Sequence, residues 1–165
     1  MVLKARSHHL FYEEVFKESN VLSSLHHKNI VSFKEVKINQ VLDSEEYVLM
    51  VMEYLEGGSL LDELKKKLKK NERFLEEEIS TILRQILEAL AFIHSINLIH
   101  GDLKLENVLY AKPNQINSIK IIDFGLGQQL RRSFISFAEG SGGTPLYMSP
   151  EHLFSHKYTY VILNS

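Results

Sequence analysis

The sequence predicts an α+β fold in which a small part built mainly of strands precedes a larger part built around a long helix. Residues 29–36 and 46–53 are rich in β-branched, aromatic and other apolar side chains, a composition that is typical of strands. Residues 75–94 instead place apolar side chains at positions 79, 82, 83, 86, 87, 90 and 93, which is the spacing of one helix face. Both kinds of element in one chain indicate the mixed α+β class.

The first 53 residues are predicted to hold three strands and one helix. Residues 1–5 form a short apolar run that carries Lys4, and we interpret them as the end of a strand. Residues 11–25 follow as an amphipathic helix, because apolar residues recur there with charged residues between them (Phe11, Val15, Leu22 and Leu25). The strand at 46–53, which contains YVLMVME, is apolar enough to lie deep in a sheet.

Turn and cap residues mark the transition to the helical part. Glu56-Gly57-Gly58-Ser59 ends the strand at 46–53, and Ser59 is a suitable N-cap for a short helix that runs through Leu64. The basic run KKKLKKNER at 65–73 is interpreted as a solvated helix face and loop rather than as a docking patch. The long helix then begins with glutamates at 76, 77 and 78, which suit the positive end of the helix dipole.

The rest of the chain is predicted to contain a short strand pair and a long loop. Residues 108–110 and 118–122 flank a polar turn, AKPNQIN, whose proline and asparagines are turn residues. The segment Asp123-Phe124-Gly125 closes the second of these strands. The polar segment 128–143 shows no periodicity, and we expect a mobile loop that leads to GTPLYMSPE at 143–151.

The composition excludes several classes of protein. Hydrophobic residues make up 44% of the 165-residue chain and charged residues 24%, as in one globular domain or part of a larger one. The net charge of −2 gives no indication of binding to nucleic acid or to an anionic membrane. There is no cysteine, which excludes disulfides and thiolate metal sites, and no apolar run approaches the roughly 18 residues of a membrane helix. Since the N-terminus lacks the apolar core of a signal peptide, we expect a location in the cytoplasm or the nucleus. The sequence leaves the oligomeric state open.

Residues 98–110, LIHGDLKLENVLY, carry the strongest chemical indication. An apolar pair leads into a polar cluster that includes Asp102, Lys104 and Asn107, and an apolar run follows. A carboxylate, a cation and an amide oxygen in one short loop suit phosphoryl transfer. In that reaction the protein positions a hydroxyl, neutralises phosphate charge and holds a metal ion.

Taken in order, these stretches resemble the eukaryotic protein kinases of the serine/threonine type. HGDLKLEN at 100–107 resembles the catalytic loop of that family, DFG at 123–125 its metal-binding signature, and SPE at 149–151 the end of its activation segment. EYVLMVMEYLEGGSL is similar to the strand and hinge that hold adenine, and ESNVLSSLHHKNIV to the third-helix region and the strand after it. The motifs occur in the family's order and cover residues 2–155.

The resemblance implies a bilobal kinase-like fold, with residues 1–53 as part of the small lobe, 54–58 as the hinge and 59–165 as part of the large lobe. It also implies ATP and Mg²⁺ as cofactors and a protein with a serine or threonine hydroxyl as the substrate. Asp102 would be the catalytic base, Lys104 would stabilise the transferring phosphate, and Thr144 would pack against the base.

The resemblance further assigns metal and nucleotide ligands. Asn107 and Asp123 would hold Mg²⁺, a hard ion that prefers oxygen ligands, whereas His100 is expected to pack within the loop. Lys4 would hold the ATP phosphates and Glu18 would orient that lysine. Met52 would be the gatekeeper behind adenine, and the backbones of Glu53 and Leu55 would bond the edge of the adenine ring.

The sequence departs from the family pattern in three places. Gly101 stands where the family has an arginine that pairs with a phosphorylated activation-loop residue, so we expect any activity to be independent of loop phosphorylation. No glycine-rich loop precedes Lys4, and the chain ends soon after SPE, whereas whole catalytic domains of the family run to about 250 residues. We therefore expect a truncated fragment with an exposed sheet edge, low stability and little or no activity alone.

Two alternatives remain. Small-molecule kinases that resemble aminoglycoside and choline phosphotransferases also carry HGD, an Asn five residues later and an Ile-Ile-Asp strand end. The hinge wording, Lys104 and GTPLYMSPE favour a protein kinase over that class. The other alternative is a non-catalytic kinase fragment that binds a nucleotide or a partner without turnover.

Overall fold

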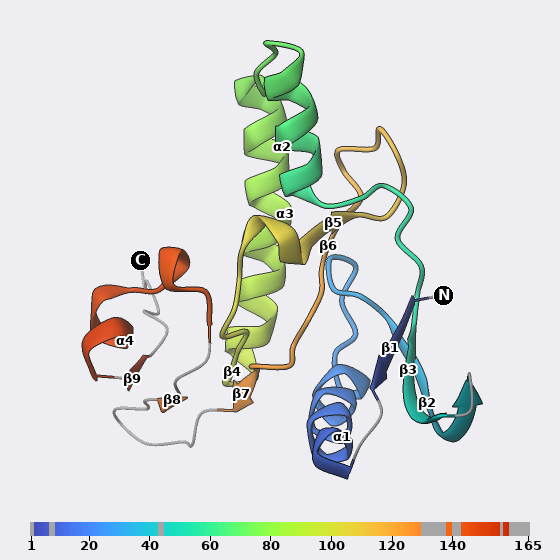
Figure 1. Ribbon diagram of the computed structural model, residues 1–165. Coiled ribbons are helices and arrows are strands. Elements are labelled where there is room, and N and C mark those ends of the chain that lie inside the picture. Colours follow the sequence, from blue (N-terminus) through green and yellow to red (C-terminus); the bar gives the residue numbers. More distant parts are fainter. Residues whose placement is uncertain are drawn as a thin grey trace.

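The computed structural model describes residues 2–6, 9–42, 45–129, 138–139, 143–155 and 157–158. The larger elements are β1 Val2–Arg6, α1 His9–Ser23, β2 Phe33–Leu42, β3 Glu45–Met52, α2 Leu60–Lys69 and α3 Glu76–Ser95 (Figure 1). The shorter ones are β4 Leu98–Ile99, the 3₁₀ turn η1 Leu105–Asn107, β5 Val108–Tyr110, β6 Ile119–Ile121, β7 Gln128–Gln129, β8 Ala138–Glu139, the 3₁₀ turn η2 Pro145–Tyr147, α4 Pro150–Ser155 and β9 Lys157–Tyr158.

The first part of the chain is a three-stranded antiparallel sheet with α1 beside it (Figure 1). The strand order is β1-β3-β2, so β3 is central, and its residues from Val48 to Met52 are buried, as the sequence predicts. Lys4 of β1 is in register with Met50 of β3. Among the described strands β1 pairs with β3 alone.

The prediction of a strand at 29–36 is wrong at its first residues, because β2 begins only at Phe33. The segment before it pairs with the later part of the chain instead. The Val31 N–H donates to the Ile121 carbonyl at 3.0 Å, and the Ile121 N–H donates to the Asn29 carbonyl at 2.9 Å. Ile30 and Val31 are apolar because they are buried against β6 and not because they lie in the sheet.

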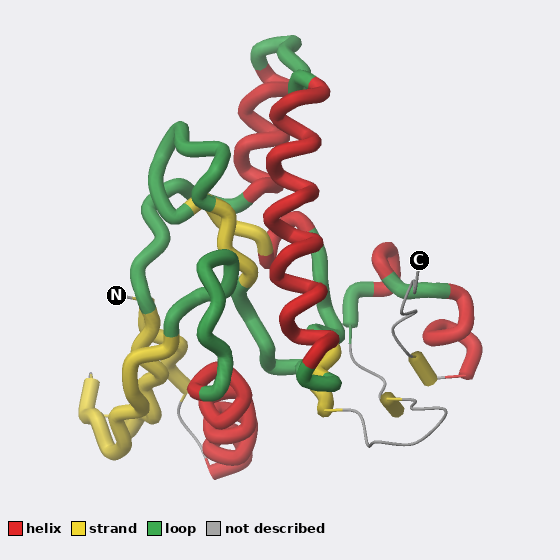
Figure 2. Tube along the Cα trace, turned by 180° about the vertical axis from the view of Figure 1, so that it is seen from behind, coloured by secondary structure: helices red, strands yellow, loops and turns green. Residues whose placement is uncertain are grey.

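Helices α2 and α3 stand side by side in the second part of the chain (Figures 1 and 2). Ser59 caps α2, as predicted: its hydroxyl accepts from the Asp62 N–H at 3.0 Å, and the Asp62 carboxylate accepts from the Ser59 N–H at 3.2 Å. The helix continues to Lys69, past the predicted end at Leu64. Lysine is a good helix former, so the basic run extends α2 instead of ending it.

The long helix α3 confirms the prediction for residues 75–94, with a shift of one residue at each end. Its inward face buries Ile82, Ala89 and Ile93, while Ile79, Leu83 and Leu87 are 43%, 50% and 61% exposed. One apolar cluster runs from the sheet through α1 to Ala89 and Ile93, whereas Ile82 belongs to a second cluster with residues of α2 and of the β5–β6 hairpin. None of the helices in the described ranges is both long and apolar enough to span a membrane.

The hairpin β5–β6 is formed as predicted, with Val108 opposite Ile121 and Tyr110 opposite Ile119. The segment after Met52 runs beside β5, because the Glu56 N–H donates to the Ala111 carbonyl and the Gly57 N–H to the Tyr110 carbonyl, each at 3.0 Å. The predicted mobile loop lies mostly outside the described residues. Within it, β7 pairs with β4, and β8 pairs with β9.

Candidate active site

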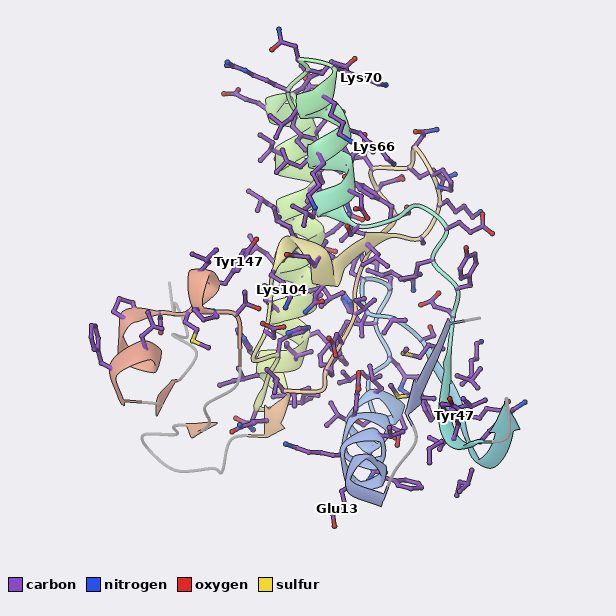
Figure 3. All side chains as sticks on the ribbon, in the orientation of Figure 1. Glu13, Tyr47, Lys66, Lys70, Lys104 and Tyr147 are labelled. Atoms are coloured by element: carbon purple, nitrogen blue, oxygen red, sulfur yellow. The ribbon has the colours of Figure 1, made fainter. Side chains whose placement is uncertain are left out.

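Three polar side chains from two distant stretches meet at the Asp102 carboxylate. Lys104 Nζ lies 2.6 Å from Asp102 Oδ2 and 2.8 Å from Thr144 Oγ1, and the Thr144 hydroxyl donates to Asp102 Oδ1 at 2.7 Å. The structure thus brings together the predicted base, the predicted phosphate-stabilising lysine and the predicted threonine (the lysine is labelled in Figure 3). The Asp102 carboxylate therefore has one positively charged donor, Lys104, and one neutral donor, Thr144.

These contacts decide the protonation of the cluster. Burial of Asp102 favours its neutral form, but the hydrogen bonds from Lys104 and Thr144 and the lysine charge outweigh burial and lower the pKa of Asp102 below its usual value. The hydrogen bond to Asp102 raises the pKa of Lys104, and the charge of Asp123 contributes to that rise. At neutral pH the cluster is therefore a carboxylate that can accept a proton beside an ammonium group that can neutralise phosphate charge.

Asn107 holds the loop through its side-chain nitrogen and leaves its side-chain oxygen available for a ligand. Its Nδ2 donates to the Asp102 carbonyl at 2.8 Å and to Asp102 Oδ2 at 3.3 Å. The Asn107 side-chain oxygen makes no hydrogen bond within the described part of the chain, and it is not among the buried polar atoms that lack a partner. An amide oriented in this way has its oxygen free for a cation.

A backbone hydrogen bond places the second predicted metal ligand next to the first. The Ile122 N–H donates to the Asn107 carbonyl at 2.9 Å, so Asp123 directly follows the residue that is tied to Asn107. Asp123 has a left-handed backbone, with φ +63°. In the described ranges no three His, Asp or Glu side chains cluster as a metal site of their own. The Asp–Asn pair instead suits a hard ion that takes its remaining ligands from phosphate and water.

His100 connects the loop at 100–107 to the strand that precedes Asp123. Its Nε2 lies 2.9 Å from the Ile122 carbonyl oxygen, its Nδ1 accepts from the Asp102 N–H at 3.2 Å, and its ring packs on Phe124 at 4.7 Å between centroids. The side chain is 2% exposed, and this burial lowers the pKa of His100. A neutral, buried ring with both nitrogens engaged packs and orients, which agrees with the expectation for this residue.

Gly101 replaces the family's arginine, and the backbone conformation at this position also favours a glycine. Its φ is +83°, and a Cβ atom at this position would lie 2.6 Å from the Leu126 carbonyl oxygen. A side chain fits here only if the backbone at Leu126 moves. The expected independence from loop phosphorylation stays a prediction, because residues 130–137 and 140–142 lie outside the described part.

The residues predicted to contact the nucleotide lie at the other end of the site. Met52 and Leu55 are buried in the apolar cluster that joins the two parts of the chain, on either side of Glu53. Glu18 is 3% exposed on the inner face of α1, although it is charged. The Lys4 side chain lies outside the described part of the structure, so its contact with Glu18 stays a prediction.

The sequence analysis missed a role for the Glu53 side chain. Its Oε1 accepts from the Ser32 N–H at 2.6 Å and pairs with Lys120 Nζ at 2.7 Å, and Lys120 also reaches the Ile30 carbonyl at 3.3 Å. This contact ties the end of β3 to the α1–β2 connection and to β6. No motif spacing could have revealed it, because the partners are far apart in the chain.

Comparisons with known proteins agree with this geometry. The family model described as "Protein kinase domain" matches residues 1–162. The chain is 42% identical over 146 residues to calcium-dependent protein kinase 6 of Plasmodium berghei, and 36% identical over 146 residues to calcium/calmodulin-dependent protein kinase type 1 of Caenorhabditis briggsae. It is also 34% identical over 141 residues to the probable serine/threonine-protein kinase fhkC of Dictyostelium discoideum. These alignments cover 88%, 88% and 86% of this chain, but only 9%, 38% and 22% of the relatives. The chain belongs to the protein kinase domain family.

Proposed function

We propose that this chain carries the catalytic loop of a serine/threonine protein kinase, which transfers the γ-phosphate of ATP to a protein hydroxyl. The observation that carries the proposal is the set of hydrogen bonds among Asp102, Lys104 and Thr144. An ionised carboxylate held beside an ammonium group and a hydroxyl is the arrangement that orients an alcohol and accepts its proton. Family membership itself implies ATP and a divalent metal.

The individual roles follow from this arrangement. Asp102 accepts the proton of the substrate hydroxyl, and Lys104 offsets the charge of the phosphoryl group. The metal, which we propose is Mg²⁺, would be held by Asn107 and Asp123 and supplies charge neutralisation when bound. Residues 54–58 serve as the hinge, and the backbones of Glu53 and Leu55 bind adenine.

Thr144 favours a protein substrate over a small molecule. It belongs to the segment 143–151, and its hydroxyl donates a hydrogen bond to Asp102, the proposed base. Residues Leu146 and Tyr147, just after it, are 94% and 48% exposed. A segment that is fixed at the base and exposes apolar side chains beside it suits the docking of a peptide. The relatives named above are protein kinases, and no observation favours the small-molecule class.

The proposal is tested in two steps on the 165-residue chain. Nucleotide binding is measured first, as the shift in melting temperature with ATP and Mg²⁺ against ATP with EDTA, because this readout needs no turnover. Phosphotransfer is then measured with radiolabelled ATP on matched peptides that differ only in Ser, Thr, Tyr or Ala at one position. We expect a Mg²⁺-dependent shift and slow labelling of the Ser and Thr peptides alone. Labelling of the Tyr peptide, or of a free aminoalcohol such as choline instead of the peptides, would refute the assignment.

A further inference from the structure

Helix α3 is apolar on two faces. Its inward face packs on the rest of the chain, but three large apolar side chains on its outer face are exposed (Ile79, Leu83 and Leu87). A surface helix has one apolar stripe with polar residues opposite, whereas a helix that is apolar on two sides is normally covered on both. The outer face of α3 is therefore built to be covered, and the described part of the chain supplies no cover for it.

This outer face forms an open groove of about 830 Å³. All the residues that line the groove belong to α3 and lie between Glu76 and Ala91, so none of the proposed active-site side chains takes part. In the view from behind, α3 lies in the foreground, and no other described segment crosses in front of it over most of its length (Figure 2). A second helix can therefore lie along this face.

The residues along the middle of the face follow the heptad spacing of paired helices. Alternating intervals of four and three residues keep one line of side chains in contact with a neighbouring helix. Here these intervals connect Glu76, Ser80, Leu83, Leu87, Leu90 and His94, which we call the seam. Leucines occupy the middle of the seam, and its two ends are an acidic and a basic residue.

The seam is complementary to itself when a second copy of α3 lies antiparallel to the first. A twofold axis level with Gln85 places residues at equal distances before and after it at the same level of the two helices. A leucine then meets a leucine, a small side chain meets a large one, and an acid meets a base. The pairs are Leu83 with Leu87, Ser80 with Leu90, and Glu76 with His94, each formed twice.

Charge favours the antiparallel over the parallel orientation. The first turn of α3 is acidic (Glu76, Glu77 and Glu78), and its last turn contains His94. A parallel pair would bring the two acidic turns together, whereas an antiparallel pair places each of them beside the last turn of the other copy and aligns the helix dipoles favourably. Near the axis, Arg84 keeps its own counter-ion, because it pairs with Glu88 of the same chain at 3.3 Å.

We propose that the outer face of α3 is the interface of a symmetric, antiparallel dimer of this chain. The contact involves one helix of 20 residues, which is about 30 Å long. A stable interface buries about 800 Å² on each partner, more than one helix face of this length provides, so we expect a weak dimer that exchanges with the monomer. The catalytic loop lies outside the contact, and the proposal does not depend on the proposed kinase function.

Sedimentation velocity on the 165-residue chain without nucleotide tests the dimer from low to high micromolar concentration. We expect one reversible step from monomer to dimer. Leu83→Gln should raise the dissociation constant about tenfold, because it places an amide twice in the apolar middle of the seam. Glutamine is a good helix former, so α3 itself is retained, and circular dichroism verifies this. Leu68 is 65% exposed on α2, and the matched change Leu68→Gln should leave the dissociation constant within about twofold.

Disulfide trapping tests the orientation, because the chain contains no cysteine of its own. Ser80→Cys and Leu90→Cys are prepared as separate chains and mixed in a thiol redox buffer. The antiparallel register places the two introduced thiols at the same level. Two copies of Ser80→Cys instead hold their thiols about 15 Å apart along the helices, too far for a disulfide. The mixture should therefore cross-link at least about tenfold faster than either variant alone.

Three results would overturn the proposal. A chain that stays monomeric at every concentration would leave the outer face of α3 to a segment outside residues 1–165. Aggregates of no fixed size, or an equal loss of the dimer in Leu68→Gln and Leu83→Gln, would show that general stickiness and not the seam drives association. Faster cross-linking of Ser80→Cys with itself than with Leu90→Cys would contradict the antiparallel register.

Discussion

The two ends of the proposed active site are built in different ways. At the catalytic end, Asp102, Lys104 and Asn107 lie within six residues of one loop, and only Thr144 comes from a distant stretch. At the nucleotide end, Glu18 lies on α1 and Lys4 on β1, while Met52 is the last residue of β3 and Glu53 and Leu55 lie just after that strand. The first end is organised by hydrogen bonds between side chains, whereas at the second end Met52 and Leu55 are buried in the apolar cluster. Local spacing therefore encodes the chemistry, whereas packing of separate elements encodes the nucleotide site.

The catalytic end should show the largest effect of a single substitution. Asp102→Asn keeps the shape of the side chain but removes the proposed base, so phosphotransfer should fall about 10³-fold. Binding of ATP and Mg²⁺ should stay within about twofold, because Asp102 is not assigned to the nucleotide. Labelling rates and thermal shifts measured on the same preparation distinguish these effects. Residual labelling close to that of the unchanged chain would rule out Asp102 as the base.

Asp123 is the second proposed metal ligand, and its loss should be the next largest effect. Asp123→Ala should weaken binding of ATP in the presence of Mg²⁺ at least about tenfold, since one of the two proposed protein ligands of the ion is removed. In EDTA the variant and the unchanged chain should bind ATP equally. Isothermal titration with and without the metal provides both numbers. A loss that is the same in EDTA would indicate damage to the fold and not to a metal site.

Glu18 tests the nucleotide end. Glu18→Gln should weaken ATP binding about tenfold, the effect of losing one hydrogen bond to a charged group at a buried position. Glu13 is exposed on the same helix and extends away from the sheet (Figure 3), so Glu13→Gln should leave binding unchanged. If the two variants behave alike, Glu18 does not orient a phosphate-binding lysine.

Loss of the contact between Glu53 and Lys120 should lower the free energy of unfolding more than it lowers the rate of phosphotransfer. Lys120→Met leaves the Glu53 carboxylate with one donor fewer, and the free energy of unfolding should fall by about 1.5 to 3 kcal/mol. The Lys120 side chain is 16% exposed, whereas Lys37, which pairs with Glu35, is 45% exposed, and Lys37→Met should cost under about 1 kcal/mol. Urea denaturation of the three proteins measures the difference, and equal costs would contradict this assignment.

The smallest expected effect is a loss of folding stability at acidic pH. Burial lowers the pKa of His100 in the folded chain, so the unfolded chain binds more protons below the usual value of 6.5. The stability contributed by neutral His100 is fully present above that value and is lost as pH falls from 6.5 toward the lower folded pKa. Burial also lowers the pKa of His27 and of His94, which should add to the slope. Denaturation between pH 8 and pH 5 should therefore show a decline that begins near 6.5 and is shallower in His100→Gln. An unchanged slope would contradict the role of His100.

The sequence predicts the catalytic end almost completely and the connections between elements poorly. Asp102, Lys104 and Asn107 meet because their spacing is fixed within one loop, and the family pattern adds Thr144. By contrast, Ile30 and Val31 were predicted to lie in a strand, because a short apolar run has the same composition in a sheet strand and in a buried connection. The extension of α2 to Lys69 was underestimated because a polar run carries no apolar periodicity.

Buried polar contacts between distant residues are the other part that sequence could not provide. Asn29 Nδ2 donates to Gln85 Oε1 at 3.3 Å and to the Ile119 carbonyl at 2.8 Å, which ties the α1–β2 connection to α3 and β6. Gln85 belongs to no motif, and Asn29, although it lies in the stretch ESNVLSSLHHKNIV, has no assigned role there. Such pairs follow from the packed fold and cannot be inferred from spacing along the chain.

The hydroxyl of Thr144 gives the resting site a particular property. It is an alcohol bonded to the base, and so it is chemically the same kind of group as the serine or threonine that the site is proposed to phosphorylate. A substrate hydroxyl that reaches Asp102 Oδ1 exchanges one alcohol for another, with little change in the solvation of the carboxylate. Thr144 is thus an internal stand-in for the substrate.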